Sequence, residues 1–537
     1  MSKNIVYTDD YSNVCKHIAK ILTDDNCLSM STINKLIKQT CSKYKLSIIP
    51  KNEHIIKYLP YESKYRKLLL VKPIKTASGV AVITVMPKPY NCPHGKCIYC
   101  PGGIEFNTPM SYIGTEPSTK IAQSLDYDPF HQIKSKLDQF YKRGHNLSKI
   151  ELVVVGGTFP FMPIDYQKNF AKSCFDALND KISPNLKESM LLNETARHRC
   201  VGFTVETKPD YCKQSHIDVM LSIGVTRVEI GVQTLDNKTY HLINRGHDLN
   251  DVKESFAISR NAGYKIVAHM MPGLPNSSPQ QDIENFRQLF TDPNFMPDML
   301  KIYPTLVLKN TGLHKLYTDG MYIPYTNDDL INVLIEVKKF VPPWLRIMRI
   351  QREIESTDIL AGPKNGNLRQ IVLEKLRKDG FSCQCIRCRE IGLNKINPYD
   401  TEIILNRIDY IASGGNEIFL SLESENNHNI LGFLRLRNIP NPKRIELQDK
   451  NNSITNACIV RELHVYGSLV DIGNSSSSIS TYQHKGFGHK LMKEAEKIAR
   501  NEFNVRKLSV ISSVGTRSYY KKLGYNQNGP YVTKILK

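Results

Sequence analysis

The sequence predicts an α/β protein in which a partial, open barrel of six βα units is followed by a smaller α+β domain. Six short runs rich in Val and Ile alternate with stretches of helical periodicity, and repeated βα units indicate a parallel sheet with right-handed crossovers. Six units are too few for a closed eight-stranded barrel, so we expect an open one with its active site at the carboxyl ends of the strands. From about residue 396 the pattern changes to neighbouring strands and one amphipathic helix.

The expected barrel strands are apolar runs flanked by turn residues, at 80–86, 150–155, 201–206, 227–232, 264–270 and 300–307. Helices are expected between them at 163–179, 213–223, 248–262 and 280–290. In the second domain we expect strands at 417–424, 429–438, 457–467 and 507–512, a glycine turn leading into a helix within 483–502, and a short helix within 516–525. The chain thus divides into a basic N-terminal region, the barrel, a linker and the α+β domain, with expected bounds of 1–75, 76–345, 346–395 and 396–537.

Composition excludes several classes of protein. The chain has 537 residues, of which 41% are hydrophobic and 23% charged, and this balance is typical of a globular enzyme and unlike a disordered chain. No apolar run approaches the roughly 20 residues that span a bilayer, and the N-terminus has no apolar signal segment. The 13 cysteines are therefore expected to be reduced thiols or metal ligands in a cytoplasmic protein, or in a nuclear one if the source is eukaryotic.

Positive charge is concentrated near the N-terminus. The net charge is +20, and the stretch from Lys35 to Lys75 holds eleven Lys and Arg against two Glu. Four tyrosines lie among these cations, at Tyr44, Tyr58, Tyr61 and Tyr65. Cations for phosphates and rings for stacking are what looped RNA requires. A solvated basic face with a few packed tyrosines would give the same pattern, so both interpretations remain open.

Three cysteines follow the first predicted strand, in the motif C-x4-C-x2-C formed by Cys92, Cys97 and Cys100. A structural zinc ion would need a fourth ligand, which His94 could provide. A [4Fe–4S] cluster held by three thiolates would instead leave one iron open to a small chelating cofactor. With the partial barrel, this motif resembles the radical S-adenosylmethionine (SAM) enzymes, in which the open iron binds the amino and carboxylate groups of S-adenosyl-L-methionine. The resemblance implies a [4Fe–4S] cluster and S-adenosyl-L-methionine as cofactors.

Polar residues at other strand ends agree with a ligand inside the barrel. Gly156 and Gly157 follow the second strand, where superfamily members contact the methionine part of SAM, although a plain tight turn would also use them. Charged or amide side chains also occur in strongly apolar segments, at Glu206, Glu229, Gln233 and Arg245. Buried charges need partners, which a zwitterionic cofactor or an internal ion pair would supply.

The C-terminal domain contains a second binding motif. Residues 483–488 fit Q-x-x-G-x-G directly before a helix, and glycines there let a pyrophosphate approach the amide groups of a helix N-terminus. The preceding strand around 461–467 and the later pair Tyr519 and Tyr520 complete an order that resembles the GNAT acyl-CoA domain. In that fold a late tyrosine acts near the leaving thiol. The alternative is an ordinary α+β domain with tyrosines in its core.

The two modules together resemble the catalytic subunit of Elongator and its single-chain relatives. The resemblance covers residues 35 to 537 and includes the segments PIKTASGVAVITVM, CIYCPGG, VAHMMPGLPN and RELHVYGS. It implies an acyltransferase that carboxymethylates C5 of the tRNA wobble uridine with acetyl-CoA as co-substrate. In the family's proposed route, a deoxyadenosyl radical takes hydrogen from the acetyl methyl group. The resulting radical adds to C5, and thioester hydrolysis releases CoA.

The resemblance also implies site residues and partners. Cys92, Cys97 and Cys100 would hold the cluster, and Tyr519 and Tyr520 would be catalytic. The residues expected to bind acetyl-CoA are Lys149, Glu462, Leu463, His464, Val465, Phe487, Gly488, His489 and Tyr520. A solvated lysine and a satisfied core histidine remain alternatives for Lys149 and His464. The expected partners are the anticodon loop of tRNA, acetyl-CoA, and Elongator-type subunits or a second copy of the chain.

Two questions stay open at this stage. Cys383, Cys385 and Cys388 near the domain junction suggest a structural zinc ion, but only three ligands are visible and free buried thiols explain them equally well. The chain could also be a protein lysine acetyltransferase with a structural iron–sulfur domain. A surplus of 20 positive charges would repel basic histone tails, which favours RNA. Complete cysteine, glycine and tyrosine sets argue against an RNA-binding module that has lost its activity.

Overall fold

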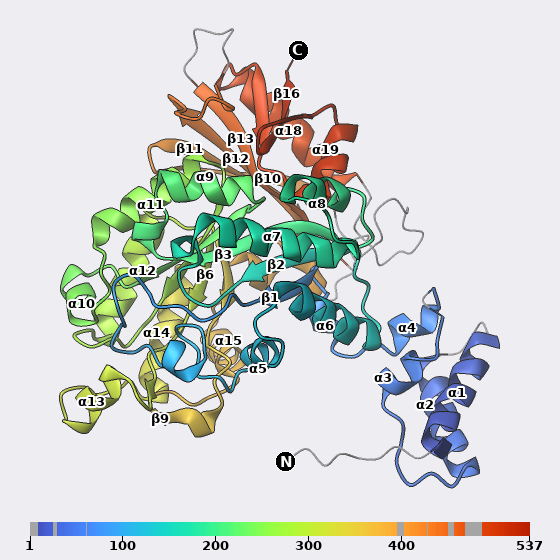
Figure 1. Ribbon diagram of the computed structural model, residues 1–537. Helices are drawn as coiled ribbons and strands as arrows, with labels where there is room; N and C mark the ends of the chain where they lie inside the picture. The colour runs from blue at the N-terminus through green and yellow to red at the C-terminus, as the bar shows by residue number, and fades with distance from the viewer. Residues whose placement is uncertain are drawn as a thin grey trace.

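The computed structural model describes residues 9–24, 29–60, 62–394, 402–426, 428–448, 456–467 and 486–536. Figure 1 shows a small group of N-terminal helices to one side, a central sheet covered by helices, and a second sheet domain above it. The predicted glycine motif therefore lies only partly within the described residues, from Gly486 onward, and Gln483 lies outside them. Within the described residues, no helix combines the length and the apolar character needed to cross a membrane.

The central sheet is the open barrel that the sequence predicts. Within the described residues it has seven parallel strands in the order β1-β2-β3-β4-β5-β6-β8. Their bounds are β1 (Ala81–Val85), β2 (Lys149–Val154), β3 (Arg199–Thr207), β4 (Arg227–Gln233), β5 (Lys265–Met270), β6 (Met299–Ile302) and β8 (Arg346–Arg349). The strand predicted at 300–307 is divided, because β7 (Val307–Leu308) pairs with β9 (Ile359–Ala361) instead. The seventh strand, β8, comes from the segment expected to begin the linker.

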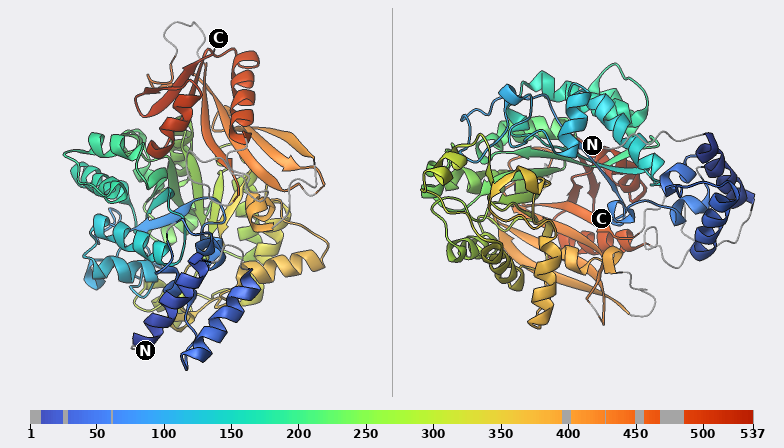
Figure 2. Two further views of the ribbon diagram at one scale, coloured as in Figure 1. Left: turned by 90° about the vertical axis from the view of Figure 1, so that its right-hand side faces the viewer. Right: turned by 90° about the horizontal axis from the view of Figure 1, so that it is seen from below.

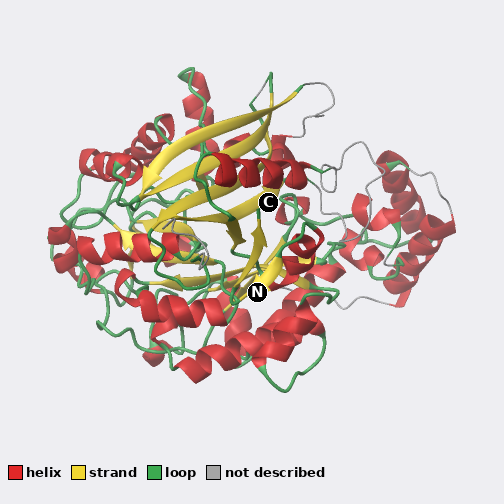
Figure 3. Ribbon diagram, turned by 90° about the horizontal axis from the view of Figure 1, so that it is seen from above, coloured by secondary structure: helices red, strands yellow, loops and turns green. Residues whose placement is uncertain are grey.

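Helices cover the outer face of this sheet (Figure 2, Figure 3). The helices of this part of the chain are α5 (Pro117–Ser124), α6 (Pro129–Lys142), α7 (Ile164–Asn179), α8 (Leu186–Asn193), α9 (Gln214–Ser222), α10 (Asn237–Leu242), α11 (Leu249–Asn261), α12 (Pro279–Thr291), α13 (Gly312–Thr318), α14 (Asn327–Lys339), α15 (Leu368–Lys378), α16 (Ile386–Arg389) and α17 (Ile391–Asn394). Of these, α13 packs beside β7, and α16 and α17 contribute to the core of the C-terminal domain. The four helices predicted from periodicity correspond to α7, α9, α11 and α12. Several begin with a side-chain cap, such as Asp248, which accepts from the amides of Asn250 and Asp251.

The C-terminal domain has a seven-stranded sheet in the order β10-β11-β12-β13-β14-β16-β15 within the described residues. Its strands are β10 (Ile403–Ala412), β11 (Gly415–Ser424), β12 (Ile430–Pro440), β13 (Asn456–Val465), β14 (Lys507–Val510), β15 (Asn526–Asn528) and β16 (Tyr531–Ile535), and its helices are α18 (Phe487–Asn501) and α19 (Arg517–Lys522). All neighbours are antiparallel except β13 and β14. The sequence missed β10, whose residues alternate between half-buried and exposed.

One buried arginine joins the two large domains. The pairing of β12 with β13 shifts between Arg435 and Leu436, and Arg461 is the extra residue of the resulting bulge. The Arg461 guanidinium donates to both carboxylate oxygens of Asp298 at 2.8 and 2.6 Å, to Glu417 at 2.7 Å, and to the carbonyl of Tyr264 at 2.8 Å. Asp298 lies directly before β6, so the pair connects the bulge to the amino end of the barrel.

The N-terminal helices form a separate small core. They are α1 (Asp9–Asp24), α2 (Met30–Lys43), α3 (Asn52–Ile56) and α4 (Lys64–Leu68), and their inward residues form one apolar cluster. Two members of the basic stretch are structural. Tyr65 is buried in that cluster, and buried Arg66 donates to the carbonyl groups of Ile56 and of Tyr141 on α6. Neither side chain is therefore on the surface, and Arg66 attaches the helices to α6 of the barrel.

We predict that Asp298→Asn destabilises the whole chain. Asp298 and Arg461 have no exposed side-chain surface, and removing one partner of a buried ion pair costs about 3–5 kcal/mol because the other charge is left unpaired. Differential scanning calorimetry should show a clearly lowered Tm. Asp328→Asn is the matched control, because the Asp328 side chain is 84% exposed and its loss should cost less than about 0.5 kcal/mol. Equal Tm values for the two variants would contradict this role of the pair.

Candidate functional site

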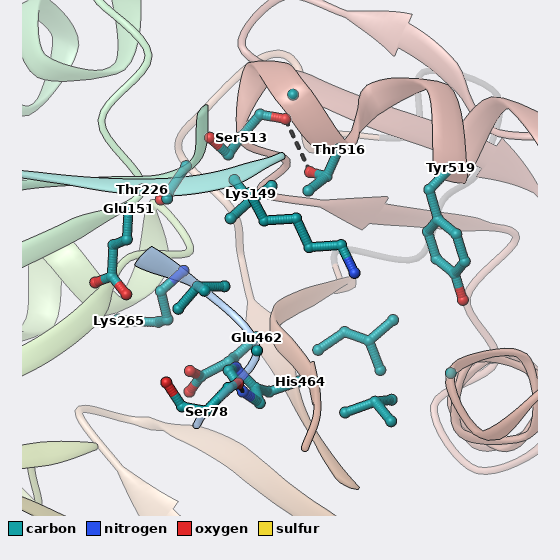
Figure 4. A pocket seen from close by; sticks show the side chains of 18 of the residues that line it. Ser78, Lys149, Glu151, Thr226, Lys265, Glu462, His464, Ser513, Thr516 and Tyr519 are labelled. Atoms are coloured by element: carbon teal, nitrogen blue, oxygen red, sulfur yellow. Dashed lines mark hydrogen bonds between the residues drawn. The ribbon is translucent and has the colours of Figure 1, made fainter. Parts of the chain in front are cut away.

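A cavity of about 1030 Å³ lies between the barrel and the C-terminal domain (Figure 4). Residues from both domains line it, and this set includes every residue that the sequence predicts for acetyl-CoA: Lys149, Glu462, Leu463, His464, Val465, Phe487, Gly488, His489 and Tyr520. Tyr519, which is predicted to be catalytic, lines it as well. Segments more than 300 residues apart in the sequence are thus brought to one cavity.

The cavity opens at the amino ends of the barrel strands. Its barrel lining consists of the first inward residues of successive strands, which include Lys149, Gly202, Arg227, Lys265 and Arg346. The cysteine loop follows the carboxyl end of β1, at the other end of the same sheet. On β3 the cavity lining extends from Arg199 to Thr204, and Glu206 is two residues further, which corresponds to about 7 Å. The sequence predicts the active site at the carboxyl ends of the strands, whereas this cavity begins at their amino ends.

The C-terminal domain contributes a strand segment and a helix start. Strand β13 pairs with β14 from Cys458 to Val460, and its continuation Glu462–Val465 lines the cavity. Helix α18 starts at Phe487, after Gly486 at a φ of 83°. A Cβ at Gly488 would lie 2.7 Å from the Tyr519 hydroxyl oxygen. The helix start can therefore receive an anion at close range, as a pyrophosphate requires.

The two tyrosines on α19 differ in environment. Tyr519 is 38% exposed, whereas Tyr520 is 6% exposed and packs edge-on against Tyr519, with ring centroids 5.2 Å apart. Burial raises the pKa of Tyr519 to about 12 and that of Tyr520 further. Both hydroxyl groups therefore keep their protons at neutral pH and can donate them.

Lys149 and His464 reach the cavity from opposite sides. Lys149 is the first residue of β2, and Figure 4 shows its side chain extending into the cavity toward the side on which Tyr519 lies. His464 stacks on Phe433 with ring centroids 6.0 Å apart, and its Nε2 lies 3.2 Å from the carbonyl oxygen of Ser78. Burial lowers the pKa of His464. A neutral, hydrogen-bonded His464 thus forms part of the cavity wall.

The three cysteines of the loop gather beneath β1. Cys97 and Cys100 are buried and Cys92 packs beside them. Burial and the neighbouring thiols raise the pKa of Cys92 to about 11. Among the described residues, the sulfur atoms of Cys92, Cys97 and Cys100 do not all lie within 4.8 Å of one another. A single zinc ion with bonds of about 2.3 Å would hold sulfur atoms closer than that, so the spacing suits a larger group.

Hydrogen-bond donors surround this loop. The Ser111 amide donates to the Cys100 sulfur at 3.1 Å, and the buried Arg245 guanidinium lies 3.6 Å from the Cys97 sulfur. The His94 Nε2 is 3.2 Å from the same sulfur. Buried side-chain atoms without a hydrogen-bond partner also occur there, at His94 Nδ1, Tyr99 Oη and Arg245 Nε. A charged, sulfur-rich group with polar ligands fits these donors.

Glycines and charges line the barrel beyond this loop. Gly156 has a φ of 126° and a Cβ there would lie 2.9 Å from Pro109, so only glycine fits. Its amide donates to Glu206 at 3.1 Å. Deeper in the barrel, Glu229 accepts from Lys301 and lies 2.9 Å from His269. The ion pair with Lys301 thus supplies the partner that the buried carboxylate of Glu229 needs.

Sequence analysis missed His269 and Lys301. The sequence contained a signal for both residues, because each is a polar residue at an inward-facing position of a strand that is otherwise mostly apolar. His269 and Lys301 lie further along their strands than the cavity residues Lys265 and Met299, toward the end of the barrel that carries the cysteine loop.

A second cysteine group lies near the domain junction. The sulfur atoms of Cys383, Cys385 and Cys388 all lie within 4.8 Å of one another. The buried Lys338 ammonium is 3.3 Å from the Cys383 sulfur and 3.8 Å from that of Cys388. This compact set can hold one small metal ion. The Lys338 ammonium beside it would balance part of the negative charge of the thiolates.

Family models match successive parts of the chain. The ELP3 N-terminal domain matches residues 11–77, the radical SAM superfamily 86–290, the radical SAM C-terminal domain 297–378, and the acetyltransferase (GNAT) domain 479–534. The central barrel is thus a radical SAM domain and the C-terminal domain a GNAT domain.

Whole proteins with both domains are similar along their entire length. A tRNA uridine(34) acetyltransferase of Methanocaldococcus infernus is 42% identical, over 97% of this chain and 98% of its own. The human Elongator complex protein 3 is 43% identical, over 94% of this chain and 93% of its own. The solved structure of the archaeal M. infernus Elp3 with N-terminus deletion is 40% identical, with a TM-score of 0.74 over 86% of this chain and all of that one. The chain therefore belongs to the family of Elongator complex protein 3 and the tRNA uridine(34) acetyltransferases.

Proposed function

We propose that this chain carboxymethylates C5 of the wobble uridine of tRNA, with acetyl-CoA as donor and radical SAM chemistry. One observation carries the proposal: the cavity that suits acetyl-CoA is lined on one side by the GNAT domain and on the other by the inner face of a radical SAM barrel. An ordinary acetyltransferase needs only the GNAT domain and an open groove for an external amine. A barrel in that position is explained if the acetyl methyl group itself is the reacting group.

In this proposal the GNAT side binds and orients acetyl-CoA. The first turn of α18, with Gly488, receives the pyrophosphate, and the extended segment Glu462–Val465 that lines the cavity lies along the pantetheine arm. From the barrel, the Lys149 ammonium attracts the thioester end of the molecule. The acetyl group is then directed along the polar interior of the barrel and away from solvent.

Cys92, Cys97 and Cys100 are proposed to hold a [4Fe–4S] cluster, with Arg245 and the Ser111 amide donating to the thiolates. With S-adenosyl-L-methionine bound, the cluster supplies a 5′-deoxyadenosyl radical. The residues of this chain supply the geometry: glycine at Gly156 allows close backbone approach, and its amide is oriented by Glu206. Tyr520, whose buried hydroxyl keeps its proton, is suited to donate a hydrogen bond to the departing CoA thiolate.

Transfer RNA is the proposed substrate on the surface. The relatives named for tRNA modification match the whole chain, and the basic N-terminal helices provide cations beside the barrel. Tyr44 is 39% exposed and remains available for stacking. Subunits of an Elongator-type complex or a second copy of the chain are proposed as protein partners.

A structural zinc ion is proposed at the second cysteine group. Zinc bonds to sulfur of about 2.3 Å require sulfur atoms as close as those of Cys383, Cys385 and Cys388. Three thiolates around Zn²⁺ leave one negative charge, which the Lys338 ammonium neutralises. The site would tie helix α14 to the segment between the two catalytic domains.

The decisive experiment is nucleoside mass spectrometry. The reduced, reconstituted protein is incubated with SAM, tRNA and acetyl-CoA that carries a deuterated methyl group. We expect carboxymethyluridine that retains two deuterium atoms, with the third recovered in 5′-deoxyadenosine. Cys97→Ala should yield neither product. If Cys97→Ala instead acetylates protein lysines as fast as the unmodified chain, and no modified nucleoside forms with either, the lysine acetyltransferase alternative is correct.

The two tyrosines should separate chemistry from binding. Tyr520→Phe removes only the hydroxyl group that is proposed to donate to the CoA thiolate. The kcat for CoA release should therefore fall roughly 100-fold, while the KM for acetyl-CoA changes little. Tyr519→Phe removes the hydroxyl that packs against Gly488, so it should raise KM and leave kcat nearly unchanged. Steady-state kinetics of CoA release on tRNA measures both. An identical effect of the two substitutions would refute separate roles.

Metal analysis should distinguish the two cysteine groups. The reconstituted chain should contain about one zinc and about four irons. Cys385→Ser should lose the zinc and lower Tm but keep the iron, whereas Cys97→Ala should lose the iron and keep the zinc. Inductively coupled plasma mass spectrometry on both variants provides the measurement. Full zinc content in Cys385→Ser would exclude that site.

A further inference from the structure

Lys265 occupies an unusual position in the cavity. It is the first residue of β5, and its side chain is among those that line the cavity, as Figure 4 shows. The next residue, Ile266, belongs to the apolar core on the outer face of the sheet. Alternation along the strand therefore directs Lys265 inward.

Hydrogen bonds on both sides hold Lys265 against the GNAT strand. The Tyr264 carbonyl accepts from Arg461 at 2.8 Å, and the Ile266 amide donates to Asp298 at 2.9 Å. Asp298 is itself paired with Arg461. The bulge of β13 is thus attached to both neighbours of Lys265, and Glu462 follows the bulge directly. In consequence Lys265 lies beside the segment on which the acetyl-CoA thioester is proposed to lie.

The Lys265 ammonium has no ion pair or hydrogen bond with any residue that the structure describes. Burial lowers the pKa of Lys265 to about 8; the Glu462 and Asp298 carboxylates oppose this shift, and the Arg227 and Arg461 guanidiniums add to it. A substantial fraction of Lys265 is consequently a neutral amine near neutral pH, which is the nucleophilic form.

We propose that Lys265 is an acetyl acceptor, so that the chain acetylates itself at this position from acetyl-CoA bound in the cavity. This inference rests on the proposed binding of acetyl-CoA. The amine nitrogen of Lys265 attacks the thioester carbonyl carbon, a C–N bond forms, and the C–S bond breaks. The nitrogen loses one proton, which Glu462 can accept and pass to the CoA thiolate, so the products are Nε-acetyl-lysine and CoA. No oxidant or reductant is needed.

Acetylation would change the cavity. The product is neutral and longer than the lysine side chain, so it removes a cation beside Glu462 and occupies space that the acetyl group of the next acetyl-CoA needs. Self-acetylation therefore inhibits further use of acetyl-CoA. It should accumulate when acetyl-CoA is present and the radical reaction cannot proceed.

The test uses the full chain with acetyl-CoA carrying a ¹³C-labelled acetyl group, without SAM or reductant. Peptide mass spectrometry follows the label on Lys265 and on Lys187, an exposed lysine of α8. We expect Lys265 to be labelled at least about tenfold faster at pH 7.5, because its neutral fraction is far larger than that of an ordinary lysine. Its rate should rise up to about pH 8 and then level off, whereas that of Lys187 should continue to rise.

Two controls make the outcome decisive. Gly488→Ala blocks the helix start, so it should reduce both acetyl-CoA binding and Lys265 labelling, while Lys187 labelling stays the same. Isothermal titration calorimetry of acetyl-CoA on the unmodified chain is measured in parallel. If acetyl-CoA binds but Lys265 is labelled no faster than Lys187, self-acetylation is wrong and the proposed function stands. If acetyl-CoA does not bind, the proposed function fails and this inference fails with it.

Discussion

The ion pair between Arg461 and Asp298 determines how the two catalytic domains meet. Both side chains are fully buried, and the cost of removing two charges from water is offset only because nearly every polar atom finds a partner. Burial alone would raise the pKa of Asp298, but the guanidiniums of Arg461 and Arg435 hold it below its usual value. The apolar core of the barrel continues through Ile459, Ile511 and Tyr531 of the GNAT domain. The buried ion pair therefore fixes how the two domains are positioned, and apolar packing stabilises the interface between them.

The same interaction fixes the geometry of the cavity. Arg461 is the extra residue of a bulge, and a bulge rotates the residues that follow it. The bulge thus turns the segment Glu462–Val465 along the cavity. Asp298, at the amino end of the barrel, binds Arg461 and so holds the barrel against this segment. Residues of the barrel thus form one side of the cavity, and the amines of Lys149 and Lys265 are among them.

The inside of the barrel holds several buried charges. Strands of parallel sheets are usually apolar on both faces, yet here the inner face has Glu151 and Arg227 beside the cavity and Glu229 with Lys301 further along the strands. Glu151 pairs with Arg227 and Glu229 with Lys301, which lowers the cost of burying them. Glu206 lies beside Glu229 on the neighbouring strand. The cavity is at the amino ends of the strands and the cysteine loop is at the other end, so the pair of Glu229 with Lys301 lies between them.

Local sequence signals determined much of this protein. Apolar periodicity predicted six barrel strands and four of the helices, and short motifs identified the cysteine loop, the glycine turn and the tyrosine pair, because each depends on residues close together in the chain. The sequence did not reveal the edge strand β10, the seventh barrel strand, or the partners of Glu229, since these depend on contacts between distant segments. It counted Arg66 among the cations of a basic stretch, whereas the structure buries Arg66 and bonds it to the carbonyl of Tyr141 on α6. Only the tertiary structure decided at which end of the barrel the GNAT domain docks, because a long-range ion pair such as Arg461 with Asp298 leaves no trace in local pattern.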